Sequence, residues 1–372
     1  MSINLGALLS TLVAFQLMFM AIYLFTHKKG NRRNNRLLGF LFLIFSLSLV
    51  DFIVRVSEIP IKYPLIHLID DGFFFLYGPI IYFYVKGVVY RDFELLFKNV
   101  IHVIPFIAYF SYICYHLFLL DAGTQDEVFT EIASSGLPKW FLLLMLSFYA
   151  HILCYLWFSW KSIEDYQSYI KDAFSSIERI NLEWLDFMVK AFALITVVAM
   201  INNIVPIFET PVMQYASLIL LMIISFVFIN RVIVKALNQP AIFSGITLAS
   251  TKKYASSNLS PRELSMYKTK LIDLMEEGKV YLNPELSSKE LAGKMNISTK
   301  YLSQLINQGF NKNFFDFVNT YRCEEVKRLL NQNDRKRTIS EAMYEAGFNS
   351  KSSFNKEFKK LTGKTPSEFK RD

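Results

Sequence analysis

The stretch that decides the fold runs from Thr338 to Arg371 and reads TISEAMYEAGFNSKSSFNKEFKKLTGKTPSEFKR. Thr338 and Glu341 have the spacing of a capping box, which predicts the start of a helix. Gly347 stands where this helix should end, because glycine enters the left-handed conformation without a Cβ penalty. The pattern therefore predicts two short helices joined by a tight turn, which is a helix-turn-helix.

The two predicted helices differ in their faces. The apolar stripe of the first helix consists of Ile339, Ala342, Met343 and Ala346. The second helix can be capped by Asn349 or Ser350, and its predicted buried stripe is Phe354, Phe358 and Leu361. The other face of the second helix carries Lys351, Ser352, Asn355, Lys356 and Lys359, with almost no acid. A basic, polar second helix of this kind fits the major groove of DNA.

The segment GFNSKSSFNKEFKKLTGKTPSEFK closely resembles the end of the AraC/XylS transcription-regulator domain. That family has a Gly-Phe turn, a helix ending in Phe-Lys-Lys, and then Gly-x-x-Pro-x-x-aromatic-Lys/Arg. The resemblance implies an earlier second helix-turn-helix, and the sequence contains one. Ser287 and Glu290 begin a helix, Asn296-Ile297 forms the turn, and Ser298 caps the next helix. An amphipathic helix over residues 313–331 links the two units, so the resemblance covers about residues 264–371.

The resemblance also implies which residues contact DNA. The base-reading positions correspond to Lys300, Ser303, Gln304, Lys351, Ser352, Asn355 and Lys356. The phosphate contacts are expected from Lys312, Lys359, Lys364 and the helix that opens at Thr365. Many relatives have Arg where this chain has Gln304, and Gln suits adenine as Arg suits guanine. The first unit is therefore expected to differ from those relatives in base preference or to bind more weakly.

Charge is distributed unevenly along the 372 residues. Residues 252–372 hold 23 Lys and Arg against 15 Asp and Glu, which accounts for the whole net charge of +8. The excess positive charge thus lies in the part that resembles a DNA-binding domain, as a polyanionic partner requires. The whole chain is also 53% hydrophobic and 16% aromatic, which is too apolar for an ordinary soluble protein.

The apolar residues form seven stretches long enough to cross a membrane. They are Ser2–Thr26, Leu37–Val54, Leu65–Val85, Val100–Leu120, Trp140–Trp160, Phe187–Phe208 and Val212–Asn230. A signal peptide is the rival interpretation of the first stretch, but the basic residues follow it instead of preceding it. With the N-terminus outside, the inner loops hold 11 Lys and Arg and the outer loops hold 3. The positive-inside rule therefore places the C-terminus in the cytoplasm of a bacterial cell, at its inner membrane.

Acidic residues near the outer ends of the second and third stretches are candidates for a ligand pocket. They are Asp51, Asp70 and Asp71, with Arg55 beside them. Carboxylates at the water interface, or paired internally, are the bland alternative. The inner segment 161–186 is helix-compatible and can extend the neighbouring spans to contact the C-terminal domain. A plain solvated connection is the alternative there.

The sequence therefore predicts an all-α protein with a seven-span transmembrane sensor at 1–237, a linker at 238–259 and a DNA-binding domain at 260–372. Its two helix-turn-helix units are expected at about 287–307 and 338–361. The predicted partners are double-stranded DNA, the lipid bilayer and an unidentified small-molecule or membrane signal, and a homodimer is left open. No catalytic residues, cofactor or metal site are expected. The predicted function is that of a membrane-bound transcription regulator that senses a signal. The alternative functions are a membrane-tethered DNA anchor without sensing and a transporter-like protein with a regulatory DNA-binding tail.

Overall fold

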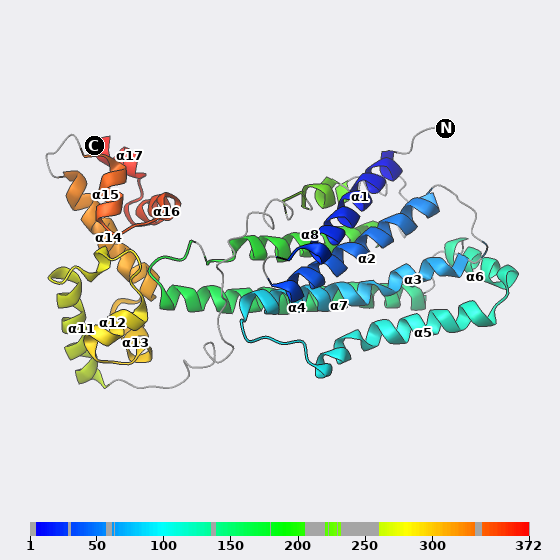
Figure 1. The fold of residues 1–372 in the computed structure, drawn as a ribbon, viewed down its shortest axis with the longest axis horizontal. Coiled ribbons are helices and arrows are strands. Elements are labelled where there is room, and N and C mark those ends of the chain that lie inside the picture. Colours follow the sequence, from blue (N-terminus) through cyan, green and yellow to red (C-terminus); the bar gives the residue numbers. More distant parts are fainter. Residues whose placement is uncertain are drawn as a thin grey trace. The chain divides into compact units, whose positions relative to one another are not determined.

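A computed structural model describes residues 5–28, 31–56, 62, 64–134, 139–178, 180–204, 220–221, 223–228, 230–231, 260–331 and 337–371. Within these ranges the secondary structure is helical, apart from isolated bridge residues, which include the antiparallel pair Phe174 and Ser287 (Figure 1). The chain divides into two compact units. Unit 1 comprises Met1–Ile163 and Glu183–Leu248, and unit 2 comprises Glu164–Leu182 and Ala249–Asp372.

Unit 1 is built from long apolar helices and shorter helical elements between them. In chain order they are α1 (Leu5–Thr26), α2 (Arg32–Val56), η1 (Pro64–Ile66), α3 (His67–Gly72), α4 (Phe74–Val89), η2 (Phe97–Val103), α5 (Ile104–Leu119), α6 (Ala122–Ser134), α7 (Lys139–Ala173) and α8 (Glu183–Ile204). The part of the chain that the structure describes contains six helices long and apolar enough to cross a membrane. Most of the predicted seventh span, Val212–Asn230, and all of the linker at 238–259 lie outside the described residues.

Two elements of unit 1 differ from the sequence prediction. The segment 121–139, expected to be a connecting loop, contains α6, whose first turn is capped by Asp121, because its carboxylate accepts a 2.8 Å hydrogen bond from the Thr124 amide. The fifth span continues well beyond Trp160 as the 35-residue helix α7, which contains neither Gly nor Pro. The helical alternative for the start of segment 161–186 is therefore the correct one.

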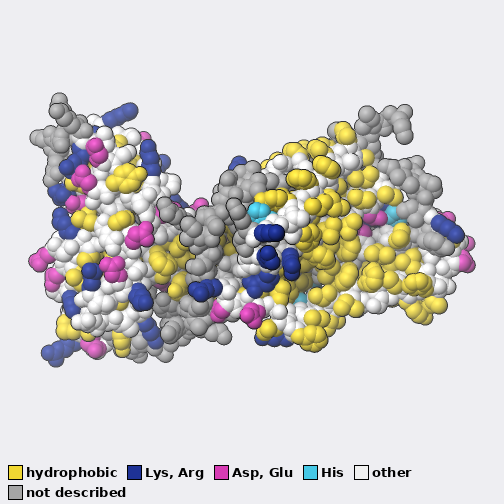
Figure 2. Space-filling view, viewed as in Figure 1, with side chains coloured by type: hydrophobic (Ala, Val, Ile, Leu, Met, Phe, Trp, Pro, Cys, Tyr) yellow, Lys and Arg dark blue, Asp and Glu magenta, His cyan; other side chains and the backbone are white. Residues whose placement is uncertain are grey.

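The surface of unit 1 carries many large apolar side chains. Phe97 and Phe118 are each 90% exposed, and Phe15 is 70% exposed. Figure 2 shows hydrophobic side chains covering much of this unit, whereas unit 2 mixes Lys and Arg with Asp and Glu. Water-soluble surfaces rarely expose contiguous apolar area on this scale, so these helices require an apolar partner or solvent.

The described part of unit 2 contains eight helical elements besides residues 164–182. They are α11 (Pro261–Glu276), η4 (Val280–Leu282), α12 (Ser288–Met295), α13 (Thr299–Phe310), α14 (Phe314–Asn331), α15 (Ile339–Glu345), α16 (Lys351–Thr362) and α17 (Pro366–Arg371). The predicted capping box is present at the start of α15, and a second capping box, formed by Ser260 and Glu263, opens α11. Local hydrogen bonding thus fixes where these helices begin.

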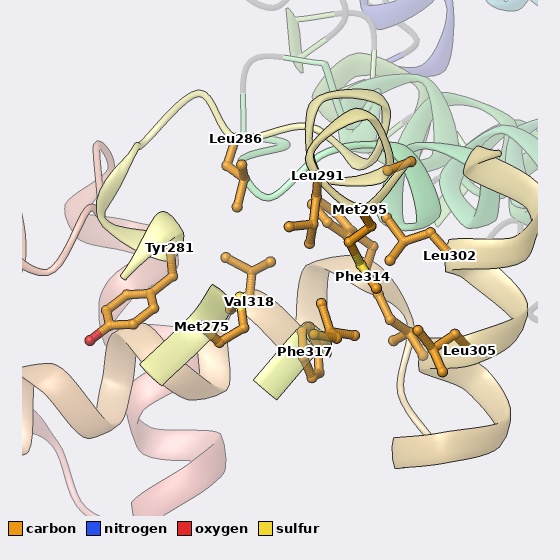
Figure 3. Close-up of a cluster of buried hydrophobic side chains, with 13 residues drawn as sticks. Met275, Tyr281, Leu286, Leu291, Met295, Leu302, Leu305, Phe314, Phe317 and Val318 are labelled. Carbon is orange, nitrogen blue, oxygen red and sulfur yellow. The ribbon is translucent and has the colours of Figure 1, made fainter. Parts of the chain in front are cut away.

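Two separate hydrophobic cores hold unit 2 together. The first core joins α11, η4, α12, α13 and the N-terminal half of α14, and includes Leu291, Leu302, Leu305 and Val318 (Figure 3). The second core joins the C-terminal half of α14 to α15 and α16 through Val326, Met343, Phe354 and Phe358. Helix α14 is therefore the element shared by both helix-turn-helix units.

Candidate nucleic-acid interface

The first helix-turn-helix unit consists of α12, a short turn and α13. The Ser287 hydroxyl caps α12 by accepting a hydrogen bond from the Glu290 amide at 3.2 Å. Asn296 ends α12 in the left-handed conformation at φ 57°, and the Ser298 hydroxyl caps α13 through the Tyr301 amide at 3.2 Å. Asn tolerates the left-handed region better than most residues do, so the predicted turn has a clear local cause.

Helix α13 buries Leu302, Leu305 and Ile306 completely. Of its three predicted base-contacting residues, Lys300 and Gln304 are half-buried, and Ser303 is only 9% exposed. The Ser303 hydroxyl accepts a 3.4 Å hydrogen bond from the Asn307 amide group, at the border between the core and the outer face. Tyr301, which is not among the predicted base contacts, is 38% exposed on this helix.

The second unit consists of α15, a glycine turn and α16. Gly347 has φ +89°, and a Cβ atom there would lie 2.6 Å from the Tyr281 carbonyl oxygen. Glycine is therefore required both by its backbone conformation and by the close approach of a neighbouring chain segment. Of the two predicted caps for α16, Ser350 is the one used, since its hydroxyl accepts a hydrogen bond from the Ser353 amide at 3.4 Å.

Helix α16 presents the predicted polar face to solvent. The exposed residues are Lys351, Ser352, Asn355, Lys356 and Lys359. Lys360 differs from these lysines, because it lies 2.8 Å from Asp316 and 3.5 Å from Glu357. The hydrogen bond to Asp316 raises the pKa of Lys360 above its ordinary value. Lys360 therefore forms ion pairs within unit 2, whereas Lys359 forms no ion pair with any described residue.

One residue of the predicted buried stripe is exposed. Leu361 is 42% exposed, and Glu357 is buried on α16 instead, at 6%. Helix α17 explains the difference, because the Phe369 ring packs edge-on against Phe358, with 5.4 Å between the ring centroids. The second core thus closes against α17 and leaves Leu361 outside it.

The predicted phosphate contacts occupy different surroundings. Lys364 and Lys359 are exposed, whereas the Lys312 ammonium donates a hydrogen bond to Thr320 Oγ1 at 2.7 Å. At the start of α17 the Thr365 amide donates to the Glu368 carboxylate at 2.7 Å. A phosphate at this helix end would have to displace that carboxylate, so Lys359 and Lys364 are the better placed pair.

A polar cluster occurs among the apolar helices of unit 1. Asp51 lies 2.5 Å from Arg55 and 2.6 Å from the His67 ring nitrogen Nδ1. Arg55 also lies 3.8 Å from Asp70, which accepts a hydrogen bond from the Ser48 hydroxyl. The structure thus brings together three of the four predicted pocket residues and adds two that the sequence did not suggest, His67 and Ser48.

Asp71, the fourth predicted pocket residue, forms no hydrogen bond or ion pair with this cluster. It follows Asp70 directly on α3. Successive helical residues point about 100° apart, so the two carboxylates leave α3 in different directions.

Comparison with known proteins concerns only the C-terminal part of the chain. A family described as a helix-turn-helix domain matches residues 291–372. A similar protein, an uncharacterised HTH-type transcriptional regulator in the cgkA 5′ region of Pseudoalteromonas carrageenovora, is 32% identical over 91 residues. Another, an uncharacterised HTH-type transcriptional regulator of Staphylococcus aureus strain COL, is 31% identical over 93 residues. No solved structure matches the chain.

The matched regions cover 24% and 25% of this chain, and 52% and 12% of those two relatives respectively. The chain therefore spans at most about half the length of either relative. Together with the geometry, the matches identify the C-terminal residues as a helix-turn-helix domain similar to those of transcription regulators, and such a domain implies DNA binding.

Proposed function

We propose that this protein is a bacterial, membrane-embedded transcription regulator that couples a signal at its apolar helices to promoter binding by unit 2. One observation carries the proposal: helices with heavily exposed apolar surfaces and a double helix-turn-helix occur in the same polypeptide. Each base-reading helix enters the major groove of double-stranded DNA. If both units engage one face of the duplex, α13 and α16 are separated by about 34 Å, one turn of B-DNA.

The apolar surface of unit 1 supports insertion into a bilayer. The exposed side chains Phe15, Phe97 and Phe118 would face lipid, where apolar side chains carry no free-energy cost of exposure to water. At the connection between α1 and α2, a cavity of about 410 Å³ is lined by His27, Lys28, Arg32 and Arg36 among others. Basic residues gathered at one end of two apolar helices suit the cytoplasmic headgroup region. The proposed topology has the N-terminus outside and unit 2 in the cytoplasm, where the chromosome lies.

The cluster of Asp51, Arg55, His67 and Asp70 is the proposed signal site. Ionisable residues between membrane helices are costly, and they commonly mark functional positions. Carboxylates beside one Arg and one His suit a cationic or hydrogen-bonding small molecule that enters from the outer side. A ligand shifts the equilibrium between two states only by its difference in affinity for them.

Genome-wide occupancy of the full-length protein tests the DNA-binding part of the proposal. Changing Lys351 and Lys356 together to Ala should abolish specific peaks while leaving the protein in the membrane. The combined change Asp51→Asn and Asp70→Asn should leave occupancy specific but unresponsive to growth conditions. Wild-type occupancy that is constant under all conditions would instead favour a membrane-tethered anchor without sensing. A C-terminal reporter accessible from the periplasm would refute the topology.

A further inference from the structure

The segment between α7 and α8 is built into unit 2. Residues 164–182 cluster with 249–372, although 66 residues of chain separate the two ranges. Phe174 forms the antiparallel bridge to Ser287, the residue that caps α12. Figure 3 shows the green ribbon of this segment passing beside Leu286. The central residue of the contact is Ser175, which is 1% exposed.

Ser175 forms hydrogen bonds through its amide, its carbonyl and its hydroxyl group. Its amide and its hydroxyl both donate to the Leu286 carbonyl oxygen, at 3.2 and 2.6 Å. Its own carbonyl oxygen accepts hydrogen bonds from Arg322 Nη1 at 3.0 Å and from Asn319 Nδ2 at 3.4 Å. Its hydroxyl oxygen accepts a further bond from Arg322 Nη2 at 3.0 Å. A single residue thus joins α14 to the segment that precedes α12.

Arg322 is the partner that makes this contact costly to break. The guanidinium is 1% exposed, and burial lowers its pKa to about 10. It makes five hydrogen bonds, two to Ser175 and one each to the Tyr281 carbonyl, the Asn283 carbonyl and the Asn319 side chain. Because a guanidinium has five N–H donors, the loss of the Ser175 hydroxyl would leave the Nη2 group of this buried charge with one hydrogen bond fewer.

The same segment also reaches the second helix-turn-helix unit. The Ser176 hydroxyl lies 2.8 Å from the Asn349 side-chain oxygen, immediately before α16. The Arg322 guanidinium also lies over the Phe348 ring, 5.8 Å from its centroid. The segment therefore contacts the start of the first unit, the shared helix α14 and the turn of the second unit.

The segment is also fixed to the end of α7. The Tyr166 hydroxyl on α7 donates to the Ile180 carbonyl oxygen at 2.6 Å, and the Gln167 side chain donates to the Asn181 carbonyl oxygen at 3.3 Å. The chain therefore turns back on α7 within a bonded loop. Residues 174–176 cannot shift without moving the last turns of α7.

We infer that residues 174–176 form a docking strand that holds the two helix-turn-helix units in one arrangement. This inference deepens the proposed function and rests on it only for its DNA-binding consequence. Displacing the strand would free the two units to change their orientation about α14. A duplex carrying both half-sites would then bind more weakly, while a single half-site would bind as before.

The test uses the full-length protein in lipid nanodiscs with Ser175→Ala. Ser168→Ala is the matched control, because Ser168 is an exposed serine on α7, seven residues earlier, without a described contact. Amides of residues 281–287 and 348–350 should exchange hydrogen about tenfold faster in Ser175→Ala, while α13 and α16 keep their protection. A third variant, Ser176→Ala, should affect only residues 348–350. Exchange equal to that of Ser168→Ala, or protection lost throughout unit 2, would overturn the inference.

A DNA readout on the same samples separates this inference from the proposed function. Wild-type protein first selects a duplex from a random pool of about 30 base pairs, and one half-site is then scrambled. Ser175→Ala should bind the intact duplex about tenfold more weakly and the scrambled one within about twofold of wild type. Equal losses on both duplexes would refute the docking role. If wild type selects no duplex, the proposed function fails, and hydrogen exchange still decides the docking strand.

Discussion

Two neighbouring lysines of α16 provide a direct test of the DNA-facing surface. Lys359 is exposed without a described ion pair, whereas Lys360 is held by Asp316 and Glu357. Each is changed to Gln, so both variants lose the same unit of charge at adjacent positions. If Lys359 neutralises a phosphate and Lys360 does not, only the first change should alter the salt dependence of DNA binding.

The expected magnitude follows from counterion release. Each phosphate contact contributes about 0.9 to the slope of log affinity against log salt concentration. Lys359→Gln should therefore lower this slope by about 0.9. If the variant and the wild type bind equally at about 1 M salt, the variant should bind about eightfold more weakly than the wild type at about 0.1 M salt. Lys360→Gln should leave the slope unchanged and lower the free energy of unfolding by at most about 1 kcal/mol, because its side chain is 57% exposed.

Fluorescence anisotropy titrations of the selected duplex at five salt concentrations measure the slope for full-length protein in nanodiscs. Thermal unfolding of the same samples shows that both variants are folded. Equal slope changes in the two variants would mean that only net charge matters, and the assignment of α16 as the groove-facing helix would be wrong. If the slope is unchanged in both variants, Lys359 does not contact a phosphate.

Three further predictions concern the stability of unit 2. Phe358→Ala empties a fully buried site in the second core and should destabilise it by about 3–5 kcal/mol, with hydrogen exchange faster in α16 but not in α13. Gly347→Ala places a Cβ 2.6 Å from the Tyr281 carbonyl oxygen and should cost about 2 kcal/mol or more in urea unfolding. Gly363→Ala, at φ +75° but in open space, should cost only about 1 kcal/mol. Hydrogen bonds from Arg328 lower the pKa of Glu325, so the stabilisation is present above the ordinary value of 4.5 and is lost as pH falls through the folded-state pKa. The free energy of unfolding should therefore fall less between neutral pH and pH 3 in Glu325→Gln than in the wild type, by at most about 1 kcal/mol.

The features predicted correctly from sequence are those with local causes. The capping box at Thr338 and the turn at Gly347 depend on residues within a few positions of each other. The division of α16 into buried and polar faces also follows from its own period, except at Leu361. There the outcome depends on α17 folding back so that Phe369 meets Phe358, which helical periodicity within α16 does not encode.

The contacts that sequence reasoning missed join distant residues. Ser175 and Arg322 are 147 positions apart, and neither belongs to a recognisable motif that would pair them. His67 and Asp51 are 16 positions apart on different helices, and only the packing of α2 against α3 brings them together. Predicting such pairs requires the tertiary arrangement, because a polar residue alone does not reveal its partner.

The uninterrupted course of α7 makes the rotational phase between its two ends a measurable quantity. Without Gly or Pro along its 35 residues, α7 has no built-in hinge, so one inserted residue turns everything after it by about 100°. Inserting one Ala after Lys161 should therefore turn residues 164–173 about the axis of α7 by that angle, whereas inserting seven restores their direction to within about 20°. If promoter binding is lost after one inserted residue and regained after seven, it depends on the rotational angle between the two ends of α7.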